Sequence, residues 1–225
     1  MTFFSFAWDW LNQAQQWHGS NGIPLRLLQH LGYTGLALLI AALIALPLGA
    51  IIGHTGRGAF AVVSLANIWR SIPTLGLLVL MVILLGFSVA TWLIPLVALA
   101  IPPILVNSYE AVLGVERGVK DAARGMGMTP LQVLLKVEMP VALPLIVLGL
   151  RTAAIFVVAT ATIAAEIGLG GLGRYIIDGL ASNDYGEVAG GALLVVALAL
   201  LVQVSFVGLR RLVVPAGLRQ ETAES

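Results

Sequence analysis

Long apolar stretches without Asp, Glu, Lys or Arg dominate the chain; they cover residues 31–56, 71–109, 152–165 and 188–209. A helix that crosses a hydrocarbon core of ~30 Å needs about 20 residues. Residues 33–52 and 188–209 therefore predict one membrane-spanning helix each. The stretch 71–109 is ~58 Å long as a helix and predicts a hairpin of two spans. Its turn is marked by Gly86, Phe87, Ser88 and Thr91.

A fifth span is predicted from Pro140 to Ala165, where Arg151 is the one charged residue. The pattern therefore predicts an all-α integral membrane protein with about five transmembrane helices. We expect a transmembrane domain over residues 31–211, followed by a cytoplasmic tail at 212–225.

The first 30 residues are rich in aromatic side chains but do not resemble a signal peptide. They lack a basic start, a clean apolar stretch and a small-residue cleavage site. Phe3, Phe4, Trp8 and Trp10 together with Asp9 predict a helix that lies at headgroup depth. The alternative is an additional partial span.

Composition supports a membrane protein and excludes several other classes. Apolar residues make up 59% of the chain and charged residues 10%, whereas soluble domains draw roughly a quarter of their residues from the charged set. The formal net charge is +1 and no dense basic patch occurs, so nucleic acid is not an expected partner. The absence of cysteine excludes disulfides and thiolate sites.

Lys and Arg placement predicts the orientation. If residues 110–137 are cytoplasmic, eight basic residues lie inside, namely Arg57, Arg117, Lys120, Arg124, Lys136, Arg210, Arg211 and Arg219. Arg26 and Arg174 then lie outside. This asymmetry follows the positive-inside rule and places the N-terminus outside and the C-terminus in the cytoplasm.

The polar segment at about 110–138 predicts two short cytoplasmic helices with a sharp corner between them. Gly127 accepts the left-handed conformation that ends a helix. Thr129 is expected to cap the second helix, with Pro130 at its first position and Gln132 completing a capping box. Three leucines are expected to share one apolar face beside Met126 and Met128; these are Leu131, Leu134 and Leu135. Such a face suits docking to another protein.

This segment resembles the cytoplasmic coupling motif of ABC importer permeases, written Glu-Ala-Ala, three residues, Gly, nine residues, Ile-x-Leu-Pro. The matching positions are Asp121, Ala122, Ala123, Gly127, Val137, Met139 and Pro140. Asp, Val and Met replace Glu, Ile and Leu, with charge or apolar character retained. The resemblance implies that these residues couple the permease to an ATPase.

Two further segments extend the resemblance, at Arg70-Ser71-Ile72-Pro73-Thr74 and at residues 165–173. Both are similar to the methionine-importer-like permease fold. Residues 166–176 look most like the branch that takes up glycine betaine, choline and carnitine. A methionine or other amino-acid importer is the alternative, and an ion-coupled secondary transporter is disfavoured because no carboxylate lies inside a predicted span.

The resemblance also implies an assembly in the plasma (inner) membrane of a prokaryote. Two cytoplasmic ATPases bind the coupling segments and hold ATP and Mg, so this chain needs no cofactor or metal and is not itself an enzyme. A second permease chain, identical or different, completes the pathway in the lipid. A separate extracytoplasmic binding protein delivers the solute.

Residues that line or gate the pathway are candidates only, each with a structural alternative. They are Arg70, Ser71, Pro73, Arg151, Glu166, Gly168, Gly170, Gly171 and Gly173. The arginines alternatively satisfy backbone carbonyls, and the glycines alternatively form a plain external turn. The Gly-x-Gly-x-x-Gly spacing at 168–173 follows a span and not a strand, which argues against dinucleotide binding.

Overall fold

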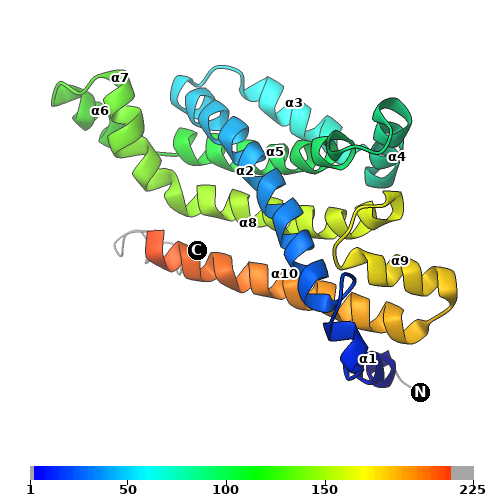
Figure 1. Cartoon of the computed structure of the whole chain (residues 1–225). Helices are drawn as coiled ribbons and strands as arrows, with labels where there is room; N and C mark the ends of the chain where they lie inside the picture. The colour runs from blue at the N-terminus through cyan, green and yellow to red at the C-terminus, as the bar shows by residue number, and fades with distance from the viewer. Residues whose placement is uncertain (1–2, 214–225) are drawn as a thin grey trace. The chain divides into compact units, whose positions relative to one another are not determined.

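The computed structural model describes residues 3–213, apart from the side chains of Val63, Leu65, Asn67 and Arg70. All regular elements within this range are helices (Figure 1). The α-helices are α1 Phe3–Leu11, α2 Ile23–Thr55, α3 Ala59–Arg70, α4 Thr74–Leu85, α5 Val89–Leu113, α6 Arg117–Gly125, α7 Pro130–Val133, α8 Met139–Ile163, α9 Gly173–Ser182 and α10 Tyr185–Val213. Short 3₁₀ turns, η1 Ala14–Trp17 and η3 Ala164–Ile167, and a π-helical turn, η2 Leu134–Glu138, join some of them.

Four helical segments are long and apolar enough to cross a membrane. They are Ile23–Thr55, Val89–Leu113, Pro130–Ile167 and Tyr185–Val213. The shorter apolar helix α4 has 12 residues, which gives about 18 Å of helix. This agrees approximately with the five spans expected. The predicted hairpin turn is confirmed, because α4 ends at Leu85 and α5 begins at Val89.

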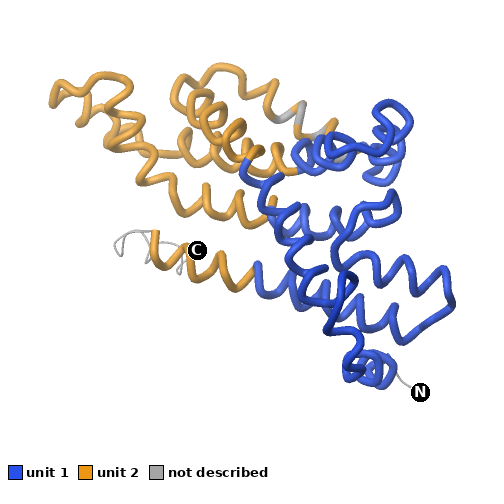
Figure 2. The backbone as a smooth tube through the Cα atoms, viewed as in Figure 1, with its two compact units in different colours: residues 1–39, 72–99, 154–202 blue, residues 40–71, 100–153, 203–225 orange. Residues whose placement is uncertain are grey.

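The chain forms two compact units, each assembled from three separate stretches of sequence (Figure 2). Unit 1 contains residues 1–39, 72–99 and 154–202, and unit 2 contains residues 40–71, 100–153 and 203–225. Residues 214–225, including Arg219 and most of the expected cytoplasmic tail, lie outside the described residues.

The core of unit 1 is built around Trp10, which is 3% exposed. Its ring meets the Tyr175 ring edge to face at a centroid distance of 5.0 Å. Gly190 lies so close to the Trp10 ring that a methyl group on this glycine would collide with it. The Tyr175 hydroxyl donates to the Asn21 carbonyl at 2.6 Å, and burial raises the pKa of Tyr175 to about 12, so this donor stays protonated. The N-terminal segment thus contributes to the core of this unit, while its position at headgroup depth stays a prediction.

The core of unit 2 depends on close packing of α2 against α5. Added Cβ atoms at Gly49 and Gly53 would lie 2.8 Å from the Leu105 carbonyl oxygen and 2.7 Å from the Tyr109 carbonyl oxygen. Buried side chains of the same unit extend this core; they are Ala50, Ala111, Val112, Leu134, Ala142 and Ile146. Small residues here allow the two helix backbones to approach.

Candidate functional site

Residues 117–138 are called the coupling segment below. Its corner at Gly127 has the predicted geometry. Gly127 has a φ of +81°, which is the left-handed conformation that glycine adopts without steric cost. The Gly127 amide donates to the Arg124 carbonyl at 2.9 Å, and the Met128 amide donates to the Ala123 carbonyl at 3.2 Å. These two bonds are those of a Schellman motif. Helix α6 is therefore ended by hydrogen bonds that require the turn at Gly127.

The second helix of the segment begins as expected. The Gln132 amide donates to the Thr129 hydroxyl at 3.4 Å, and the Thr129 amide donates to the Gln132 side-chain oxygen at 2.9 Å, which completes the capping box. However, α7 is not a separate short helix. It continues through the π-helical turn η2 into α8, so that residues 130–167 form one long helical segment.

The coupling segment presents an apolar surface formed by Met126, Leu131 and Leu135, which are 72%, 63% and 57% exposed. The expectation that Leu134 belongs to this surface is wrong. Leu134 is 7% exposed and packs in the core of unit 2. Residues 131 and 135 are about one helical turn apart and share the outer face, whereas residue 134 lies about 60° from residue 131 and about 100° from residue 135 around the helix axis.

The other residues of the coupling motif occupy different environments. Asp121 is exposed and its carboxylate lies 3.5 Å from the Arg124 guanidinium, whereas Ala123 is buried. Ala122 is exposed. The last three motif residues, Val137, Met139 and Pro140, are half-buried where η2 joins α8. The motif thus combines exposed and anchored positions, and its role in coupling stays a prediction.

A buried ionic cluster lies beside the coupling segment, and the sequence reasoning missed it. Glu138 is fully buried, with Oε2 2.6 Å from His54 Nδ1 and Oε1 3.4 Å from Lys120 Nζ. Lys120 also donates to the Val112 carbonyl at 3.0 Å. The cluster joins α6, the end of α2 and the π-helical turn within unit 2. The one sequence signal was a carboxylate between apolar Val137 and Met139, immediately before the apolar helix.

The glycine-rich turn after η3 is held by two side chains of α2 within unit 1. The Gly171 amide donates to Gln29 Oε1 at 3.1 Å, and the Leu172 amide donates to His30 Nδ1 at 3.3 Å. Since His30 Nδ1 accepts, Nε2 carries the proton and donates to the Val158 carbonyl at 3.1 Å. Both nitrogens of this fully buried ring are therefore satisfied.

The four glycines named as pathway candidates have packing or conformational reasons for being glycine. Gly168 and Gly171 have φ values of +87° and +90°. A Cβ on Gly170 would lie 2.5 Å from Gln29 Oε1, and one on Gly173 would collide with the Thr162 carbonyl oxygen. The turn is thus a structured element, and its role as a gate stays a prediction.

The remaining pathway candidates are distributed over both units. Arg151 donates from Nε to the Gln203 side-chain oxygen at 2.7 Å within unit 2, so this bond is to a side chain and not to a backbone carbonyl, and its role in the pathway stays a prediction. Arg70 ends α3, and its side chain lies outside the described part. Ser71 and Pro73 occupy the break between α3 and α4. Glu166 is exposed in η3.

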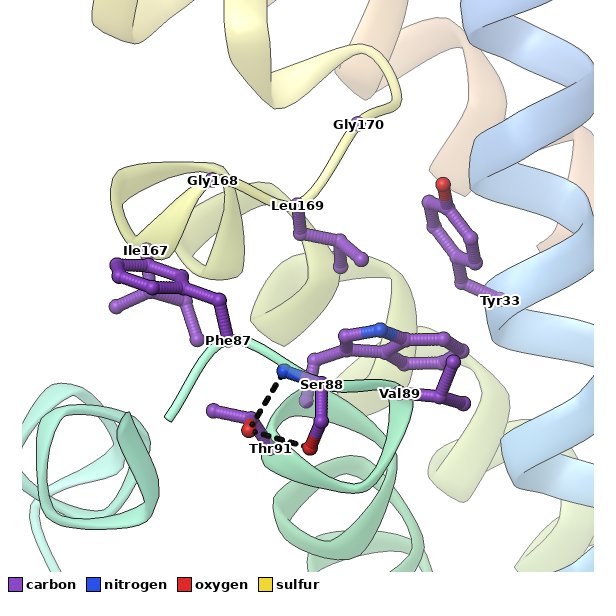
Figure 3. Close-up of a pocket in the computed structure, with 10 residues that line it drawn as sticks. Tyr33, Phe87, Ser88, Val89, Thr91, Ile167, Gly168, Leu169 and Gly170 are labelled. Carbon is purple, nitrogen blue, oxygen red and sulfur yellow. Dashed lines mark hydrogen bonds between the residues drawn. The ribbon is translucent and has the colours of Figure 1, made fainter. Parts of the chain in front are cut away.

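A hollow in unit 1 is lined by aromatic side chains (Figure 3). It has a volume of about 380 Å³ and is formed by Tyr33 of α2, the turn between α4 and α5, and residues 167–170. The Tyr33 and Trp92 rings lie 4.8 Å apart between centroids, tilted by 52°. Figure 3 shows Phe87 and Tyr33 at different edges of the hollow, with Leu169 between them. The size lies within the range of small-molecule pockets.

Comparison with known proteins identifies similar chains over most of the length. Residues 45–217 match the family described as binding-protein-dependent transport system inner membrane component. The choline transport system permease protein OpuBB of Bacillus subtilis is 33% identical over 192 residues, which cover 85% of this chain and 88% of that protein. The glycine betaine/carnitine/choline transport system permease protein OpuCB of the same organism is 33% identical over 211 residues, which cover 93% and 97%.

Solved structures agree with this similarity. A chain of the inward-facing MetNI methionine ABC transporter superposes with a TM-score of 0.73 and is 27% identical. The superposition covers 86% of this chain and 96% of that chain. Among the described residues, no group of three or more His, Asp or Glu side chains is arranged to hold a metal ion.

Proposed function

This chain belongs to the family of binding-protein-dependent transport system inner membrane components, and we propose that it is the permease subunit of an ATP-driven importer of quaternary-ammonium osmoprotectants. Glycine betaine, choline and carnitine are the solutes of this class named for its relatives OpuBB and OpuCB. The similarity to these relatives over 85% and 93% of the chain is the observation that carries the proposal. The methionine transporter among the structural neighbours supports an amino-acid solute as the second candidate.

The transport machinery would be divided among several subunits. Two cytoplasmic ATPases would bind ATP and Mg and dock on the coupling segment. A second permease chain would complete the pathway, and a separate binding protein would deliver solute from outside. The basic residues around the coupling segment support a cytoplasmic location for it and an N-terminus on the opposite side.

The coupling segment has the features that transmission of motion requires. Met126, Leu131 and Leu135 offer the apolar contact surface. The Schellman turn at Gly127 fixes the direction of α6, and the Glu138–His54–Lys120 cluster ties the segment to α2 and α8. A displacement imposed on the exposed surface would therefore be passed to membrane helices, because the segment is bonded to them at several points.

Uptake measurements test the solute class. Cells that carry the complete transporter should accumulate labelled glycine betaine, choline or carnitine, and this uptake should stop when ATP hydrolysis by the partner is disabled. Uptake of methionine alone, unaffected by excess betaine and choline, would overturn the osmoprotectant proposal and favour the amino-acid alternative.

A further inference from the structure

We propose that the aromatic hollow of unit 1 is a solute subsite in the permease itself, which binds the quaternary ammonium group. This inference rests on the proposed function for the identity of the solute. The subsite would be distinct from any site in the binding protein, and it would receive the cation during passage. Its ligand class is a trimethylammonium cation, with or without a carboxylate on the same molecule.

The lining chemistry of the hollow suits a cation that cannot donate hydrogen bonds. Three aromatic residues contribute to it, Tyr33, Phe87 and Trp92, and the lining residues include no Asp or Glu. A quaternary ammonium group has no N–H, so it gains little from polar acceptors, whereas aromatic faces attract it electrostatically, with Trp the best. Phe87 is 83% exposed, so its ring is accessible from outside the hollow.

Two polar groups at the hollow lack partners within the described range. The Tyr33 hydroxyl and the Trp92 indole N–H make no hydrogen bond to any residue of the described part, and neither side chain is fully buried. By contrast, the Ser88 and Thr91 hydroxyls bond to each other at 3.0 Å, and Thr91 also donates to the Gly86 carbonyl at 2.5 Å. Tyr33 and Trp92 thus remain available to donate to the carboxylate of a zwitterion such as a betaine.

The glycine turn keeps the hollow open. A Cβ on Gly170 would lie 3.2 Å from the Tyr33 hydroxyl, and one on Gly168 would lie 4.0 Å from the Phe87 ring. Side chains at these two positions would extend toward the groups that line the hollow. Gln29 and His30 of α2 bond to the amides of Gly171 and Leu172, directly after the residues that line the hollow. Helix α2 therefore sets the position of this side of the hollow.

An adjoining hollow has a carboxylate in its lining. It has a volume of about 390 Å³ and shares Phe87, Ile167 and Gly168 with the first. Glu166 and Arg174 also line it. Arg174 is ion-paired with Asp178, whereas Glu166 has no ion pair with any side chain that the structure describes. The uncompensated carboxylate would raise the local concentration of a cation beside the aromatic rings.

Choline binding to the purified permease–ATPase complex, without the binding protein, tests the subsite by equilibrium dialysis. The Trp92→Leu variant should bind labelled choline about tenfold more weakly, as loss of a cation–π contact implies. Trp92→Phe keeps an aromatic face and should retain most of the binding. Trp8→Leu is the matched control, because Trp8 is exposed outside the hollow.

Competition experiments test whether the hollow recognises the positive charge of the ligand or only its shape. They also test whether the ligand is a free solute or a lipid headgroup. The uncharged carbon isostere 3,3-dimethyl-1-butanol should compete poorly. Bilayers with and without phosphatidylcholine distinguish a free solute from a lipid headgroup, since only headgroup binding would make choline binding fall when that lipid is present. Choline binding that phosphatidylcholine does not change supports the solute subsite, whereas a fall in binding would assign the hollow to a lipid headgroup and overturn it.

Several results would overturn the subsite. These are absence of choline binding by the wild-type complex, equal affinity in Trp92→Leu, and competition by the isostere as strong as that by choline. Uptake by the complete transporter is measured separately. Transport of quaternary amines with no binding effect at Trp92 refutes the subsite alone, whereas choline binding without uptake of any quaternary amine refutes the proposed function.

Discussion

Removal of the charge on Glu138 is expected to loosen the attachment of the coupling segment. Glu138→Gln keeps the size of the side chain and one carbonyl oxygen. It replaces the carboxylate that lies 2.6 Å from His54 Nδ1 and 3.4 Å from Lys120 Nζ. Because Glu138 is fully buried, no water molecule can occupy the position of the carboxylate and compensate for the lost charge.

The size of the effect follows from the contacts of the cluster. A hydrogen bond to a charged group contributes about 1.5–3 kcal/mol to stability. Complete loss of one partner of a buried ion pair costs roughly 3–5 kcal/mol, because the remaining charge is left without compensation. Here Lys120 retains its bond to the Val112 carbonyl at 3.0 Å. We therefore expect the free energy of unfolding to fall by about 2 kcal/mol, which lies within the lower of the two ranges.

Thermal denaturation of the purified complex, together with ATPase stimulation by loaded binding protein, measures both consequences. Glu138→Gln should lower the denaturation midpoint and reduce stimulation. Glu110→Gln is the matched control, because Glu110 is exposed and has no ion pair in the described part of the chain. A Lys120→Met variant and the double variant complete a thermodynamic cycle, which isolates the energy of the pair.

The reasoning would be refuted by a Glu138→Gln variant that denatures at the same temperature as Glu110→Gln. It would also be refuted if Glu138→Gln and Lys120→Met had strictly additive effects, since two groups that interact must show a coupling energy.

Three further predictions concern the corner, the core of unit 1 and the topology. Gly127→Ala should cost about 1–2 kcal/mol through its left-handed backbone, although no atom crowds a Cβ there; uptake per inserted molecule should fall, and unchanged uptake would contradict the role of the corner. Gly190→Ala should cost about 1–3 kcal/mol by collision with Trp10, measured against Gly208→Ala, which faces open space; equal denaturation midpoints would count against this packing. Val119→Cys, at an exposed position of α6, should resist an impermeant reagent applied to intact cells, and labelling would reject the predicted orientation.

Features set by neighbouring residues could be predicted from the sequence. The charge gaps located the apolar helices, and Gly127 and the Thr129 capping box located the corner, because both depend on residues within one or two turns. The family expected from the spacing of the coupling motif is confirmed. These patterns needed no knowledge of which helices pack together.

Contacts between distant residues could not be predicted in the same way. Glu138 and His54 are 84 positions apart, and His30 and Leu172 are 142 positions apart, so no local pattern marks either pair. The misplacement of Leu134 has a related cause. Spacing alone defined a face broad enough for three leucines, whereas packing against Ala142 and Ile146 within the unit 2 core decides which of them is buried.

The discontinuous construction of unit 1 has a consequence for biosynthesis. Gln29 and His30 enter with the first long helix, yet their partners at Gly171 and Leu172 follow 142 residues later. At about 5–20 residues per second, the ribosome needs about 7–28 s to make that interval. During this time two polar side chains of α2 have no access to the amides that will satisfy them. We therefore expect the nascent helix α2 to stay in contact with membrane insertion factors until synthesis passes α9. The duration of this contact should shorten when Gln29 and His30 are replaced by leucine.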